Sequence, residues 1–133
     1  MEERNHNRFT PEELHLLQNF HERRAIFDDY LATHGSELFT CPGCGFPTIS
    51  SRGDFEICDV CFWEDDGQDN EDADEVRGGP NGKLSLTENR LFISQKFSSN
   101  SPYESVPKVL AFLKNIQKYH EHTASQLPVL PVY

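Results

Sequence analysis

The stretch TCPGCGFPTISSRGDFEICDVCFW, residues 40–63, contains all four cysteines of this 133-residue chain. Their spacing is C-x2-C-x13-C-x2-C, and the four positions are Cys41, Cys44, Cys58 and Cys61. Two cysteines separated by two residues allow one tight turn to direct both sulfurs at one ion. Two such turns supply the four thiolates that suit Zn2+. We therefore predict one structural zinc ion per chain. Four thiolates leave no coordination position open for water, which argues against metal catalysis.

The segment between the two cysteine pairs has the composition of a β-hairpin. Residues 46–50 and 54–57 carry strand-forming side chains, and the Ser-Arg-Gly-Asp sequence between them supplies a turn. Pro42 fixes its own φ inside the first cysteine turn. Gly45 can adopt the positive φ that leaves backbone N–H groups free to point at sulfur. The pattern predicts a small zinc-ribbon-like hairpin.

Other uses of the four cysteines are open at this point. Two disulfides would need an oxidising compartment, and a redox-active C-x-x-C pair would need a thioredoxin-like setting that the sequence does not show. Iron suits the same four-sulfur site as zinc, so the sequence alone does not separate the two metals. The first residues, MEERNHNRFTPEE, are polar, and no apolar run approaches the ~20 residues that span a bilayer. We therefore expect a cytoplasmic protein with no membrane segment, in which reduced thiols favour metal binding.

Three blocks of the sequence resemble the bacterial cysteine-rich CPCC domain family. They are CPGCGF at 41–46, EICDVCFWEDD at 56–66 and GGPNGKLSLTENR at 78–90, within a resemblance that spans residues 40–97. The family pattern has a further cysteine where this chain has Gly43. The resemblance implies a zinc-ribbon-like core in which that extra thiol is dispensable for the metal. Some members resemble immunity proteins encoded beside secreted antibacterial toxins, so the resemblance also implies a toxin-neutralising role.

A helical pattern precedes the cysteine-rich region. Thr10 is a candidate N-cap, Pro11 suits the first helical position, and Glu13 completes a capping box. Gly35 is a candidate stop. Apolar residues recur at helical spacing between these limits. They predict a buried stripe formed by Leu16, Leu17, Phe20, Phe27, Tyr30 and Leu31.

Two further helices are predicted after the cysteines. The second follows Ser85, with Glu88 three residues later, and its inward side chains would be Leu86, Ile93 and Phe97, together with Phe92. The third runs over about residues 106–120, and the tail LPVLPVY is extended because its prolines break a helix.

The expected fold class is α+β, a small zinc-ribbon-like β-hairpin with about three flanking α-helices. We expect a single domain over residues 1–133. Its parts are an N-terminal helix at 10–34, the cysteine-rich zinc-binding region at 40–97, and a C-terminal helix with the extended tail at 105–133.

Half of the acidic charge lies beside the cysteines. The net charge is −10, and residues 54–75 hold eleven of the 22 acids with no Lys or Arg. A solvated loop, a calcium site and a docking surface for a basic partner are the three interpretations. The docking interpretation places partner-binding residues on one solvent-facing surface formed by Glu64, Asp65, Asp66, Asp69, Glu71, Asp72, Asp74 and Glu75.

No motif for catalysis accompanies the cysteines, so we expect no enzyme and no catalytic residues. Phe62 and Trp63 follow the fourth cysteine and are predicted to cover the metal site. The predicted function is a small acidic zinc-binding protein that binds a basic protein partner, as an immunity protein would bind a secreted toxin domain. The alternative is a zinc-ribbon accessory module that contacts nucleic acid or its machinery. Direct binding to nucleic acid is disfavoured, because phosphate binding requires clustered basic residues.

Overall fold

The computed structural model describes residues 8–35 and 37–97. Its longest element is the helix α2, Pro11–His34. Thr10 caps α2 as predicted, because its side chain accepts from the backbone N–H of Glu13 and the Glu13 side chain accepts from the backbone of Thr10. Gly35 ends the helix in the left-handed conformation, with φ of 66°. Neither helix of the described residues is long and apolar enough to cross a membrane.

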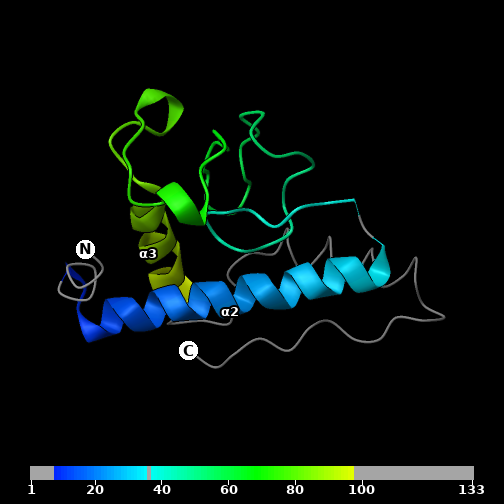
Figure 1. Ribbon diagram of the computed structural model, residues 1–133, viewed down its shortest axis with the longest axis horizontal. Helices are drawn as coiled ribbons and strands as arrows, with labels where there is room; N and C mark the ends of the chain where they lie inside the picture. Colours follow the sequence, from blue (N-terminus) through cyan, green and yellow to red (C-terminus); the bar gives the residue numbers. More distant parts are fainter. Residues whose placement is uncertain (1–7, 36, 98–133) are drawn as a thin grey trace.

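The second helix, α3, spans Leu86–Phe97 and is also confirmed. Ser85 and Glu88 form the reciprocal capping pair at its start. Figure 1 shows α2 as a long base, with α3 and the connecting loops on one side of it. Two short 3-10 helices, η1 at Asn70–Asp72 and η2 at Gly79–Asn81, interrupt those loops.

The predicted α+β fold with a β-hairpin is wrong. The described residues contain two α-helices and no strand, only the isolated antiparallel bridges Phe39–Ile49 and Ile57–Glu64. Each bridge closes the chain around one cysteine pair, so residues 46–50 do not pair with residues 54–57. The physical reason is local: the backbone groups next to each cysteine turn are already bonded to the opposite flank of the same turn. The third helix predicted at about 106–120 and the LPVLPVY tail lie outside the described residues.

The core joins the helices to the cysteine turns. Phe27 of α2 and Leu86 of α3 are fully buried and share one cluster with Phe46, Trp63 and three of the cysteines. The buried stripe of α2 is confirmed at Phe20, Phe27, Tyr30 and Leu31. On α3, Leu86 and Ile93 face inward as predicted, but Phe92 is exposed. The two helices thus pack around the cysteine turns as well as against each other.

Candidate metal centre

The four cysteine sulfurs lie close together. The Sγ atoms of Cys41, Cys44, Cys58 and Cys61 are all within 4.8 Å of one another, and none of the four forms a disulfide. The Cys41–Cys61 and Cys44–Cys58 sulfur pairs are each 3.7 Å apart. A disulfide would need about 2.05 Å. Four sulfurs placed tetrahedrally at a metal–sulfur distance of about 2.3 Å would be about 3.8 Å apart. The four cysteines are therefore positioned to bind one metal ion.

The two cysteine turns have the same backbone geometry. The N–H of Gly45 donates to the carbonyl of Cys41 at 2.8 Å, and the N–H of Phe62 donates to the carbonyl of Cys58 at 2.8 Å. Both turns then need a positive φ, which is 85° at Gly45 and 65° at Phe62. Glycine adopts this conformation readily, whereas a residue with a side chain pays about 1–2 kcal/mol. The second turn is therefore strained where the first is relaxed.

Backbone N–H groups point at sulfur in both turns. Gly43 donates to the Sγ of Cys41, and Val60 donates to the Sγ of Cys58, each at 3.3 Å. The hydroxyl of Thr48 lies 3.0 Å from the same Cys58 sulfur. Such donors stabilise thiolate charge, and groups of this kind around a metal orient and tune its ligands.

Burial shapes the chemistry of the thiols. Cys41, Cys44 and Cys58 are buried, and Cys61 is only partly so. Burial raises the pKa of the Cys44 thiol well above its ordinary value. A buried cluster of four thiolates is unfavourable by itself, and a bound divalent cation would offset about half of its charge. The residues therefore fit a metal ion.

The two aromatic residues after the fourth cysteine have different environments. Trp63 is 1% exposed and packs in the core with the cysteines, as predicted. Phe62 is 74% exposed, so the prediction that it covers the site is wrong. The positive φ at Phe62 belongs to the turn that returns the chain to Trp63.

Buried arginines from both helices hold the first cysteine turn. Arg23 of α2 donates to the carbonyl of Cys44 at 2.8 Å, and Arg90 of α3 donates to the carbonyl of Pro42 at 2.7 Å. Both arginines are buried. The positive charges of these two arginines would partly offset the net charge of about −2 that four thiolates and one Zn2+ would carry. Neither arginine was predicted from the sequence to contact the cysteine turns, although Arg90 ends the third block of the family pattern and Arg23 lies in the middle of the first helix.

Asp69 connects three arginines from different parts of the chain. Arg24 of α2 binds both of its carboxylate oxygens, at 2.7 and 2.9 Å. Arg52 donates at 2.8 Å, and Arg90 of α3 lies 3.4 Å away. Burial opposes the charged form of Asp69, but Arg24 and then Arg52 outweigh it, so the pKa of this carboxyl lies well below its usual range. Asp69 therefore ties both helices to the loop that follows the second cysteine pair.

The acidic residues do not form the uniform solvent-facing surface that was predicted. Asp65 is 1% exposed and accepts from the Arg52 guanidinium and the Gly53 N–H, each at 2.8 Å. Asp72 pairs with Arg77. The remaining acids of the set divide into the partly buried Glu64, Asp66 and Asp69 and the exposed Glu71, Asp74 and Glu75. Among the described residues, the four cysteines are the one group of Cys, His, Asp or Glu that is placed to hold a metal, which gives no support to the calcium interpretation.

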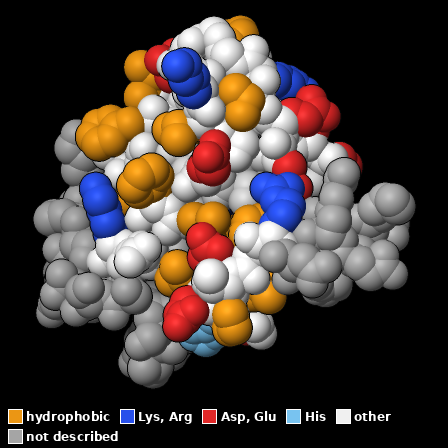
Figure 2. All heavy atoms as spheres, turned by 90° about the vertical axis from the view of Figure 1, so that its left-hand side faces the viewer, with side chains coloured by type: hydrophobic (Ala, Val, Ile, Leu, Met, Phe, Trp, Pro, Cys, Tyr) orange, Lys and Arg blue, Asp and Glu red, His pale blue; other side chains and the backbone are white. Residues whose placement is uncertain are grey.

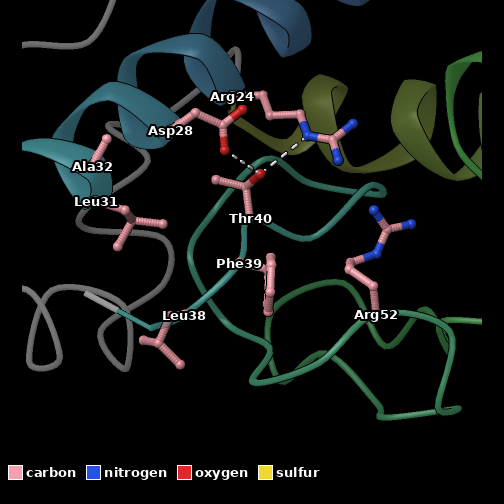
Figure 3. Close-up of a pocket in the computed structure, with 8 residues that line it drawn as sticks. All are labelled: Arg24, Asp28, Leu31, Ala32, Leu38, Phe39, Thr40 and Arg52. Atoms are coloured by element: carbon pink, nitrogen blue, oxygen red, sulfur yellow. Dashed lines mark hydrogen bonds between the residues drawn. The ribbon is translucent and has the colours of Figure 1, made fainter. Parts of the chain in front are cut away.

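A hollow beside the first cysteine turn shows how the chain is fastened to α2. Figure 3 shows Thr40, the residue before the first ligand, between two side chains of α2. Its hydroxyl accepts from Arg24 at 3.1 Å and donates to Asp28 at 2.7 Å. The cavity of about 260 Å3 is bounded by these polar groups and by Leu31 and Phe39. These contacts fix the entry of the chain into the metal centre.

Fold and site together define a small protein in which two helices and their loops surround a four-cysteine metal centre. The family model described as Cysteine-rich CPCC matches residues 39–101, which confirms the resemblance seen in the sequence. This segment is therefore similar to the cysteine-rich CPCC domain. No curated protein and no solved structure matches the chain.

Proposed function

We propose that the chain is a non-catalytic binding protein whose fold is held by one structural zinc ion. The observation that carries the proposal is the four-sulfur cluster, with all Sγ atoms within 4.8 Å and three of the four cysteines buried. A four-thiolate shell has no open position at which water or a substrate would be activated. The free energy of metal binding stabilises the folded state instead.

The proposed partner is a basic protein. The support is the net charge of −10 together with the exposed acids that keep their charge on the surface, above all Glu71 and Glu75. Acids such as Asp65 and Asp69 are engaged with arginines and are structural in this proposal. The CPCC resemblance supports a specific form of the proposal, in which the partner is a secreted toxin domain and this chain is its immunity protein.

The metal part of the proposal is tested by elemental analysis of the full chain, purified at neutral pH without chelator. The expected result is one zinc and no iron per chain. Cys58→Ser should lose the metal, whereas Asp59→Ser, which changes an exposed residue of the same turn, should retain it. Iron in the wild type, or full zinc content in Cys58→Ser, would contradict the proposal.

The partner part predicts a toxin domain encoded next to the gene, and a growth assay with that domain tests it. Cells that express the toxin should recover when the wild-type chain is co-expressed. A Glu71→Lys, Glu75→Lys double variant should protect less at unchanged zinc content, because exposed charges steer association with a basic partner. The matched control is Glu22→Lys, Glu37→Lys, which changes the net charge equally at exposed positions outside the acidic run of residues 54–75. Equal protection by both double variants would show that Glu71 and Glu75 do not contribute to binding of the partner.

A further inference from the structure

The segments before and after the second cysteine pair, residues 55–58 and 62–65, run antiparallel to each other. Ile57 and Glu64 form the bridge, the N–H of Phe55 donates to the carbonyl of Asp65 at 2.9 Å, and the N–H of Cys58 donates to the carbonyl of Trp63 at 3.0 Å. Cys58, Trp63 and Asp65 of this segment are all buried.

Three apolar residues of the same segment are exposed. Phe55 is 55% exposed, Ile57 is 53% exposed and Phe62 is 74% exposed. We call these three residues the aromatic face. Isolated exposed apolar residues are ordinary, but three within one short paired segment concentrate exposed apolar surface there. Figure 2 shows one side of the molecule, on which hydrophobic side chains are exposed and both acidic and basic side chains lie among them.

Two of the same three residues have a strained backbone. Phe55 and Phe62, with φ of 63° and 65°, are the non-glycine residues of the described chain that have a positive φ. Bulky side chains are rare in this conformation, and the equivalent position of the first cysteine turn is Gly45. Glycine at position 62 would serve the turn better and would remove an exposed aromatic ring. The fold does not require this backbone strain at an exposed aromatic residue. Its presence therefore points to a role of the side chain in binding.

Acidic residues flank the residues of the aromatic face in the sequence. Asp54 and Asp59 are exposed, Glu56 and Glu64 are partly buried, and residues 54–75 contain no Lys or Arg. A guanidinium can stack on an exposed phenylalanine ring and pair with a neighbouring carboxylate. The chemistry of the face therefore suits a partner segment with arginines and apolar side chains, and it disfavours acidic partners.

We propose that Phe55, Ile57 and Phe62 form the docking surface for a basic, amphipathic segment of a protein partner. This inference rests on the proposed function for the class of partner, and it names the residues that would contribute most to affinity. The cysteine turn holds the face in place, because Cys58 and Cys61 lie between Ile57 and Phe62 in the chain. The exposed acids at Glu71 and Glu75 then speed association rather than determine affinity.

The test is selection of random 12-residue peptides displayed on phage by the zinc-loaded full chain. Selected peptides should carry net positive charge with at least one aromatic or large aliphatic residue. A synthetic copy of the strongest peptide should bind Phe62→Gly at least ten-fold more weakly than wild type, with zinc content unchanged and the melting temperature unchanged or raised. Phe55→Gly should show the same loss. Phe92→Ala removes a similarly exposed ring, 65% exposed, from the regular helix α3 and should bind like wild type.

The outcomes separate this surface from the proposed function. Basic peptides that bind Phe62→Gly as well as wild type, but lose affinity for the Glu71→Lys, Glu75→Lys variant, would overturn the aromatic face and leave a basic partner in place. Failure to select any basic peptide would overturn both. A wild-type dimer that becomes a monomer in Phe62→Gly by analytical ultracentrifugation would show that a second copy covers the face, which also overturns the proposal.

Discussion

Gly43 should be intolerant of even a single added methyl group, and the cause is steric. An alanine Cβ at this position would lie 2.5 Å from the Oδ1 of Asn89, 3.0 Å from the Sγ of Cys61 and 3.3 Å from the Cβ of Trp63. Gly43 is not among the glycines with a positive φ, so its backbone does not require glycine. The CPCC pattern has a cysteine at this position, and in this chain Asn89 of α3 occupies the space that such a side chain would need.

The expected size of the effect follows from the close contacts. Gly43→Ala adds atoms to a packed core, which typically costs about 1–3 kcal/mol. The contact below 3.0 Å involves the Asn89 side chain, which is buried and whose Oδ1 has no hydrogen-bond partner. Asn89→Ala removes that obstacle together with an unsatisfied polar atom, so this variant should cost less than Gly43→Ala. The double variant should recover most of the loss, with a coupling energy of about 1 kcal/mol or more.

The assay is a double-mutant cycle by urea unfolding of the zinc-loaded chain, with zinc content measured for each variant. The expected pattern is a lower midpoint for Gly43→Ala and a partly restored midpoint for the double variant. Two results would refute the reasoning. One is a Gly43→Ala chain as stable as wild type, and the other is a double variant that loses the sum of the two single losses.

Three further predictions concern the metal, the core and the ion pairs. Cys58→Ser should release zinc and lower the melting temperature strongly, because metal binding contributes to folding; an unchanged melting temperature would contradict this. Trp63→Ala should lose about 3–5 kcal/mol in urea unfolding while it retains zinc, since the side chain is 1% exposed; a loss below about 1 kcal/mol would show that the site collapses to fill the cavity. The lowered pKa of Asp69 means that its ionised form is stabilised by folding, so its contribution is complete above the unfolded pKa of about 4 and is lost as pH falls. Asp69→Asn should therefore be less stable than wild type at pH 7, and the difference should shrink in unfolding measured towards pH 3; a difference independent of pH would rule out the ion pair as its cause.

The sequence predicted the elements whose determinants are local. The two C-x-x-C spacings predicted the four candidate metal ligands. Thr10, Glu13 and Gly35 predicted the ends of α2, because each of these residues lies at or near the helix end that it caps. The hairpin prediction failed because strand-forming residues indicate only a preference for extended backbone. They do not indicate which other segment of the chain will pair with them. Ile49 pairs with Phe39 rather than with a residue of the 54–57 segment.

The role of the acids could not be read from the sequence because it depends on residues distant in the chain. Asp69 meets Arg24, which is 45 residues away, and Asp65 meets Arg52, which is 13 residues away. A count of charges along the chain places these carboxylates in an acidic run with no basic residue. The fold supplies the arginines from α2, from the loop between the cysteine pairs and from α3, and it converts part of that run into internal ion pairs.

The same arginines connect the metal centre to the packing of the helices. Arg23 and Arg90 each donate to a carbonyl of the first cysteine turn, and Arg90 also lies within 3.4 Å of Asp69. Because both arginines are buried, they keep their hydrogen-bond acceptors only while the first cysteine turn keeps its conformation. The metal ion would hold that shape, since Pro42 lies between two ligands and Cys44 is itself a ligand. The chain thereby gains a connected core, in which helix packing and metal binding would stabilise each other.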